Sequence, residues 1–126
     1  MSSLRITDIK SIMCGPLPFT KVYTNEGITG LGENVVNHPA ILAGQVEMLK
    51  SILVGEDPFN IERLWIKMLQ QTSFSYMNAM ISAVDIALYD IKGKALGVPV
   101  YELLGGLYRN RIRLYPHMRG TWNSFP

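Results

Sequence analysis

The feature that most constrains the fold of this sequence is a long apolar stripe between residues 77 and 95. Its side chains recur at steps of three or four residues, the spacing of one helical face; they are Met77, Ile81, Val84, Leu88, Ile91 and Ala95. Ala79, Ala83 and Ala87 form a neighbouring row of small residues, where another element can approach the helix backbone closely. The sequence therefore predicts a buried helix that organises the fold.

The N-terminal third has the pattern of β-strands. A first β-prone stretch, rich in isoleucine, ends at Gly15-Pro16-Leu17-Pro18, and a second runs from Thr20 to Asn25. Gly27 then supplies a turn and residues 28–33 return as a third strand. Glycines 30 and 32 lie within that third strand, where they indicate either a bulge or the close approach of another backbone or a ligand.

Helical signals dominate the rest of the chain. Pro39 suits the first turn of a helix that runs to Gly55, and Asp57-Pro58 begins a second helix that ends near Thr72. Gly97 suits the end of the long helix, and a short helical turn between Pro99 and Gly105-Gly106 follows. The predicted class is α+β, a three-stranded antiparallel meander followed by a helical bundle.

The last segment returns to a strand pattern, with apolar residues alternating with Arg111 and Arg113. This strand either pairs with the N-terminal sheet or begins another domain, so we predict one domain at 1–110 and the start of a second at 111–126. A chain of 126 residues can bury one core but is too short for a (β/α)₈ barrel of about 250 residues. Residues 1–108 carry a net charge of −2 and residues 109–126 a net charge of +4.

Self-contained catalytic chemistry is not indicated. Cys14 is the single cysteine, predicted to be a buried thiol, and the two histidines fit no catalytic triad signature. Asp85 and Asp90 are five residues apart on one helix, so they point about 140° away from each other and cannot easily share a metal ion. Asp90 and Lys94 have the spacing of a helix ion pair.

Partners and location are constrained by the same composition. Four arginines without interleaved aromatic side chains make a weak nucleic-acid footprint, so no nucleic-acid partner is predicted. No apolar run approaches the roughly 20 residues that span a bilayer, and no apolar signal segment opens the chain. A cytoplasmic location without membrane insertion is expected.

Three segments resemble one enzyme family. Residues 79–106 read AMISAVDIALYDIKGKALGVPVYELLGG, residues 25–33 read NEGITGLGE, and residues 55–65 read GEDPFNIERLW. Together they are similar to the N-terminal signature of the mandelate racemase/muconate lactonizing enzyme family within the enolase superfamily. The resemblance implies an enolase N-terminal-like capping domain over a (β/α)₈ barrel, of which residues 111–126 would supply at most the first strand.

The resemblance also implies a reaction. Family enzymes remove the proton α to a carboxylate with a Lys or His base, while Mg²⁺ held by three barrel carboxylates stabilises the enediolate. Those groups lie beyond the first barrel strand, so no catalytic residue and no metal ligand is assigned here, and this chain alone is expected to be inactive. In its complete form the protein is expected to be a metal-dependent racemase or acid-sugar dehydratase acting on a small carboxylate substrate.

The resemblance places two substrate-covering loops in this chain, at residues 17–19 and 34–38. Candidate substrate contacts are Leu17, Phe19, Asn34 and His38, with His117 at the end of the first barrel strand. An apolar face is expected to meet the barrel domain or to self-associate. The alternative is a stand-alone interaction module that derives from the capping domain and has no catalytic activity; it would be well behaved in solution, with a specific partner.

Overall fold

The computed structural model describes residues 4–114 except 37 and 73, with the side chains of 74–76 also left aside. Three strands precede four helices, as predicted. They are β1 (Ile6–Cys14), β2 (Leu17–Thr24), β3 (Thr29–Glu33), α1 (Pro39–Leu53), α2 (Ile61–Gln71), α3 (Phe74–Leu96) and α4 (Val100–Leu103). The α+β class and the order of its elements are confirmed.

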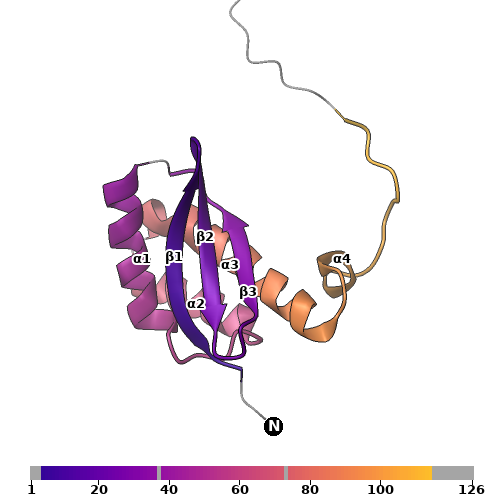
Figure 1. Ribbon diagram of the computed structural model, residues 1–126, viewed down its shortest axis with the longest axis horizontal. Coiled ribbons are helices and arrows are strands. Elements are labelled where there is room, and N and C mark those ends of the chain that lie inside the picture. Colours follow the sequence, from indigo (N-terminus) through magenta and orange to yellow (C-terminus); the bar gives the residue numbers. More distant parts are fainter. Residues whose placement is uncertain (1–3, 37, 73, 115–126) are drawn as a thin grey trace, which may run out of the picture.

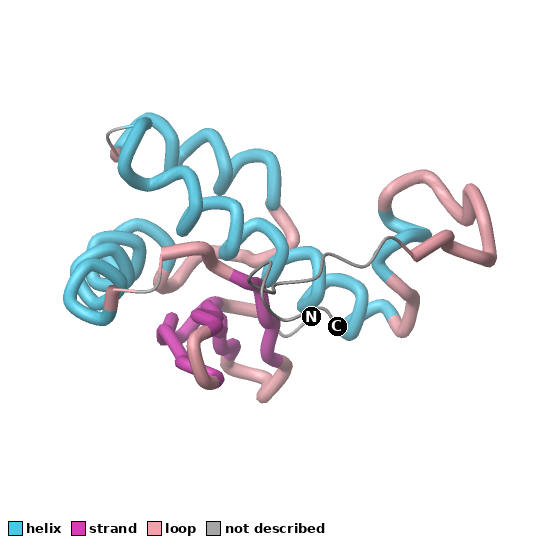
Figure 2. The backbone as a smooth tube through the Cα atoms, turned by 90° about the horizontal axis from the view of Figure 1, so that it is seen from above, coloured by secondary structure: helices cyan, strands magenta, loops and turns pink. Residues whose placement is uncertain are grey.

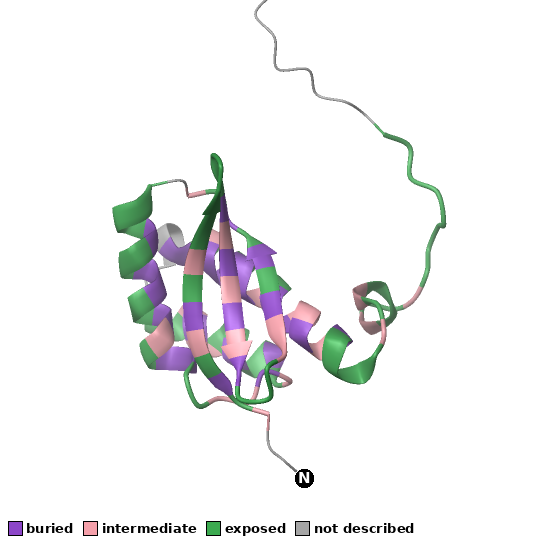
Figure 3. Ribbon diagram, viewed as in Figure 1, coloured by how far each residue is buried: buried purple, intermediate pink, exposed green. Residues whose placement is uncertain are grey.

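The sheet is an antiparallel meander in the order β1-β2-β3. The helices lie on one side of it, and α1 runs beside β1 (Figures 1 and 2). Along β2, buried residues alternate with partly exposed ones (Figure 3), because successive side chains of a strand point to opposite faces. The sheet therefore has one face in the core and one open face.

β2 begins at Leu17, three residues before the predicted start, and includes Pro18. The carbonyl of Pro18 accepts a hydrogen bond from Asn34 N–H at 2.8 Å, just beyond the end of β3. The N and C=O groups of a strand residue point to the same side, so the missing N–H of Pro18 faces away from β1. Pro18 thus costs the β1–β2 ladder no hydrogen bond, which is why the strand tolerates it.

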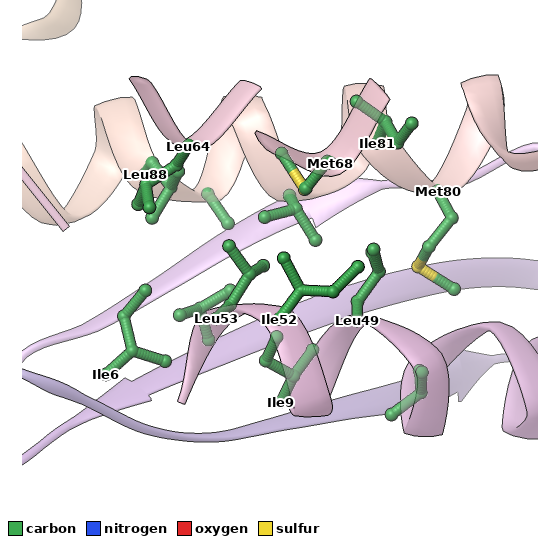
Figure 4. Close-up of a cluster of buried hydrophobic side chains, with 14 of the residues drawn as sticks. Ile6, Ile9, Leu49, Ile52, Leu53, Leu64, Met68, Met80, Ile81 and Leu88 are labelled. Carbon is green, nitrogen blue, oxygen red and sulfur yellow. The ribbon is translucent and has the colours of Figure 1, made fainter. Parts of the chain in front are cut away.

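The core lies between the sheet and the helices (Figure 4). The predicted stripe on α3 is buried from Met77 to Ile91, whereas Ala95 is exposed because the end of α3 extends past the sheet. The strands β1 and β2 and the helices α1 and α2 contribute to the same cluster, in which the fully buried members include Ile6, Ile9, Val22, Leu42, Leu49, Leu53, Leu64, Met68, Met80 and Leu88. A single core therefore holds the sheet and three helices together.

The contact between β3 and α3 depends on the two strand glycines. A Cβ atom added to Gly30 would lie 1.9 Å from the carbonyl oxygen of Ala87, and one added to Gly32 would lie 1.9 Å from that of Ala83. The predicted close approach of another backbone is confirmed. Asp90 then accepts a hydrogen bond from Leu31 N–H at 3.0 Å, so α3 also satisfies the outer edge of β3.

The end of the described chain leaves the body of the domain. Gly97, with φ 68°, ends α3 as predicted. Residues 107–114 are exposed, form neither helix nor strand, and run away from the sheet (Figure 1). The described part of the last segment therefore does not return to the N-terminal sheet, and the domain boundary at residue 110 stays a prediction.

Two further expectations can be compared with the structure. Cys14 is exposed at the end of β1, so the predicted buried thiol is wrong. Cys14 pairs with Leu17 at the hairpin tip, and directly paired residues of neighbouring strands share a face, so Cys14 lies on the open face of the sheet. Within the residues that the structure describes, no helix is both long and apolar enough to cross a membrane.

Candidate functional site

The two predicted substrate-covering segments meet at one end of the sheet. The tight turn at Gly15-Pro16 joins β1 to β2 there, and the segment after β3 lies beside it on the way to α1 (Figure 1). A hydrogen bond of 2.8 Å from Asn34 N–H to the Pro18 carbonyl joins the segment after β3 to the start of β2. We call this end of the sheet, residues 12–19 with 34–36 and 38, the loop edge.

Leu17 and Phe19 lie on strand β2, so their predicted position on a loop is wrong. The two-residue turn leaves no loop between β1 and β2, because pairing continues to Cys14 and Leu17. Buried Pro18 and Thr20 alternate with them, so Leu17 and Phe19 belong to the open face of the sheet. Their contact with a substrate remains a prediction, now from a strand.

Asn34 is buried, with 2% of its surface exposed. Its side-chain carbonyl accepts a hydrogen bond from Val36 N–H at 3.0 Å, and its amide nitrogen donates to the sulfur of Met80 at 3.5 Å. The Thr20 hydroxyl donates to the same sulfur at 3.3 Å. Asn34 therefore fixes the path of the loop, and its predicted contact with a substrate is untested.

His38 is exposed and occupies the N-cap position of α1. Its side chain makes no capping hydrogen bond, although its carbonyl accepts one from Leu42 N–H at 3.0 Å. His117, the remaining candidate, lies outside the described residues. The imidazole of His38 is thus available at the loop edge for a contact with another group.

The loop edge also exposes apolar residues that the sequence analysis did not single out. Val35, after β3, is 81% exposed, and Ile12 and Met13 are exposed near the end of β1. The alternating pattern of β1 could have placed Ile12 on the open face, but nothing in the sequence showed that Val35 would lie outside the core. The edge is suited to covering another surface, since the transfer of exposed apolar groups out of water lowers the free energy.

Asp85 and Asp90, the acidic residues that the sequence analysis compared, lie on α3, whereas Glu33 ends β3 and pairs with Phe19. Burial raises the pKa of the Asp85 carboxyl above its usual value, and the nearby Glu62 carboxylate adds to that shift. Asp90 pairs with Lys94 at 2.7 Å, as the sequence predicted. No group of three or more His, Cys, Asp or Glu side chains that could hold a metal ion occurs among the described residues. The residues present therefore do not fit a Mg²⁺ ion.

Replacing Asp85 by asparagine is expected to stabilise the chain at pH 7, by less than about 1 kcal/mol because the carboxyl is partly exposed. A raised folded-state pKa means that Asp85 favours folding below its unfolded pKa and that this contribution is lost as the pH rises through the folded value. Urea unfolding at pH 4 and pH 7 measures this. A variant less stable than the parent at pH 7 would contradict the burial of an unpaired carboxylate.

Comparison with known proteins gives this fold a context. Residues 7–105 match the N-terminal domain of the mandelate racemase / muconate lactonizing enzyme family. The D-galactonate dehydratase of Verminephrobacter eiseniae is 42% identical over 123 residues, which cover 93% of this chain and 32% of that enzyme. The D-galactonate dehydratase of Xanthomonas campestris is 46% identical over 106 residues, 81% of this chain and 28% of the enzyme.

Solved structures agree. An enolase superfamily member from Salmonella Typhimurium superimposes with a TM-score of 0.73 at 38% identity, covering 89% of this chain and 31% of that protein. An enolase from Agrobacterium radiobacter, solved with bound Na and L-malate, gives a TM-score of 0.76 at 34% identity, covering 87% and 30%. The chain therefore spans about a third of the length of the relatives that it matches.

Proposed function

The chain belongs to the mandelate racemase/muconate lactonizing enzyme family, whose N-terminal domain it contains, and we propose that it covers the substrate in an acid-sugar dehydratase. The observation that carries this proposal is the loop edge, in which the β1–β2 turn and the segment after β3 present exposed apolar groups at one end of the sheet. The similarity to two D-galactonate dehydratases favours dehydration over racemisation. The substrate class is a small polyhydroxy carboxylate.

The reaction of such an enzyme explains why a cover is needed. A base removes the proton on the carbon next to the carboxylate, and the hydroxyl of the following carbon leaves as water, giving an enol that becomes a 2-keto acid. Negative charge accumulates on the carboxylate oxygens as the proton leaves, and a bound Mg²⁺ would supply the balancing positive charge. The base and the metal ligands are proposed to lie in a barrel that this chain does not contain.

Water exclusion is the part of this chemistry that the chain can perform. Removing water from around a charged intermediate strengthens every electrostatic interaction with it. Val35, Met13 and Leu17 are exposed apolar residues of the loop edge, and His38 is an exposed polar residue of the same edge. We propose that these residues and Phe19 border the substrate, while Asn34 sets the shape of the loop.

The remaining expectations stay proposals. We propose that the chain contacts a barrel domain and that an exposed apolar face also contacts a second copy of the chain. The proposed location is the cytoplasm. A stand-alone module that binds another protein through the loop edge remains the alternative, since an exposed apolar edge would serve it equally. The module requires no barrel, so joining this chain to the barrel of a relative distinguishes a substrate cover from an interaction module.

The test is a chimera in which residues 4–106 replace the matching stretch of the Verminephrobacter eiseniae D-galactonate dehydratase. We expect the chimera to form the 2-keto acid from D-galactonate within about tenfold of the parent rate, and the same barrel without any cap to lose about 100-fold or more. This chain alone should show no turnover. A folded but inactive chimera would favour the interaction module.

Within the chimera, Val35→Asp is expected to raise KM at least about tenfold, because a carboxylate at the loop edge repels an anionic substrate and admits water. Ile66→Asp on α2 is the matched control, since Ile66 is also exposed, at 47%, but lies away from the loop edge. Steady-state kinetics of both variants measure the difference. Equal effects would show that the loop edge has no special relation to the substrate.

A further inference from the structure

The open face of the sheet, which is turned toward the viewer in Figure 1, is left without a cover by the helices. The strand registers place six of its side chains in two rows that cross the three strands. One row is Ile12, Phe19 and Glu33, and the next is Lys10, Lys21 and Leu31. Ile12 is 40% exposed and Leu31 is 43% exposed, so two corners of this face are uncovered apolar groups.

Positive charge gathers at a third corner of the open face. Lys10 and Lys21 are directly opposite each other on neighbouring strands, an arrangement of like charges that destabilises a sheet. Both ammonium groups lie over the ring of Tyr23, at 5.3 and 5.2 Å from its centre. Asp8 is 3.6 Å from Lys10 but only 3.1 Å from Lys50, and Lys21 has no ion pair in the described part of the chain. This corner therefore suits a carboxylate from another molecule.

Such a carboxylate stands at the fourth corner of the same face. Glu33 is exposed, and it has no ion pair among the residues that the structure describes. The diagonal from Ile12 to Leu31 separates Glu33 from Lys10 and Lys21. Apolar groups thus lie along one diagonal and opposite charges lie on its two sides, so the open face is complementary to itself.

We propose that the open face binds the open face of a second copy of the chain. A half-turn about the diagonal from Ile12 to Leu31 brings Glu33 of each copy over Lys10 and Lys21 of the other, and Ile12 and Leu31 against their own counterparts. The strands of the two sheets then cross at a large angle, as in the orthogonal class of sheet packing. Because both copies use the same surface, the contact closes as a dimer and does not extend into a filament.

The size of the face sets the expected affinity. Three strands of about eight residues measure roughly 14 by 27 Å, about half of the roughly 800 Å² per partner that a stable interface buries. A weak dimer is therefore expected, with a dissociation constant on the order of 100 µM. Ile12 and Phe19 also belong to the loop edge, so the two surfaces adjoin.

This inference rests on the self-association part of the proposed function, and its test involves no turnover, so it can fail while the chimera remains active, and the reverse. The 126-residue chain is analysed by sedimentation equilibrium over a range of concentrations at low and high salt. We expect a dimer at low salt whose dissociation constant rises at least about threefold at high salt, since ions screen exposed charge pairs. A chain that stays monomeric at millimolar concentration and low salt overturns the proposal.

Charge exchange identifies the face. Lys21→Glu and Glu33→Lys should each weaken the homodimer about tenfold, because each substitution sets like charges against each other in both symmetric contacts. An equimolar mixture of the two variants should recover part of the lost affinity, because Glu33 of one variant then faces Lys21 of the other and the two introduced charges have opposite signs. No recovery on mixing would contradict the proposed pairing.

Two substitutions on other surfaces are the controls. Glu102→Lys makes the same charge change as Glu33→Lys at an exposed residue of α4 and should leave the dimer unchanged. Leu31→Ser should weaken the dimer about tenfold, whereas Ile66→Ser on α2, where Ile66 is 47% exposed, should have no effect. A dimer that responds equally to the substitutions at Glu33 and Glu102, or to those at Leu31 and Ile66, would use a different surface and would overturn the proposal.

Discussion

Replacing Gly32 by alanine is expected to lower the free energy of unfolding by about 3 kcal/mol, at the upper end of what overpacking usually costs. The added Cβ would lie 1.9 Å from the carbonyl oxygen of Ala83, and that oxygen belongs to the helix backbone, so no side-chain rotation can relieve the clash. Either β3 or α3 must move. Thermal unfolding should show a loss of about 10 °C in Tm.

Gly44→Ala in α1 is the matched control, because apart from its chain neighbours and the nearby backbone of its own helix no atom lies within 4 Å of the new methyl group. Glycine inside a helix is unfavourable, so this variant should gain about 0.5–1 kcal/mol. The same substitution is thus expected to change the free energy of unfolding in opposite directions at Gly32 and Gly44. A Gly32→Ala variant as stable as the parent would mean that β3 and α3 are not in direct backbone contact.

The contact at Gly32 also illustrates what the sequence alone could predict. The alanine row of α3 indicated where another element could approach the helix, and the strand glycines indicated a bulge or the close approach of another backbone or a ligand. Each pattern is local, and in the structure the strand glycines lie against the backbone of Ala83 and Ala87. Periodicity therefore predicted both the elements and one of their packing surfaces.

Other details depend on where an element ends relative to its neighbours, which local patterns do not record. Pro18 was expected to stop a strand, yet it lies where β3 has already ended and no ladder bond is needed. Ala95 follows the apolar pattern of α3 but lies where that helix extends past the core, and Cys14 lies on the open face at the tip of a hairpin. The exposure of Ala95 follows from the length of α3 relative to the sheet, and that of Cys14 from the register of the hairpin.

The candidate site was predictable only through the family resemblance, which indicated two segments without their side-chain directions. The structure brings both segments to one end of the sheet, but it separates the candidates by role. Leu17 and His38 are exposed there, whereas Asn34 is buried. An asparagine after a strand usually indicates a solvated turn, and only the tertiary position of Met80 on α3 explains why this one is inside.

That position makes Asn34 the second residue with a large expected effect. Asn34→Ala removes the acceptor of Val36 N–H and the donor to the Met80 sulfur, and it leaves a small cavity beside them. The loss of a buried hydrogen-bonded side chain should cost about 2 kcal/mol. Hydrogen exchange at the Val36 amide should become at least about tenfold faster, beyond the change at core amides such as that of Leu49.

Asn78→Ala on α3 provides the control, because Asn78 is exposed and alanine favours a helix. It should change stability by less than about 0.5 kcal/mol and leave Val36 exchange unaltered. If Asn34→Ala lowers global stability without a selective effect at Val36, then Asn34 acts as an ordinary core residue. A selective effect would instead mean that the shape of the loop beside Leu17 and His38 is set from within the core, through one amide and one sulfur.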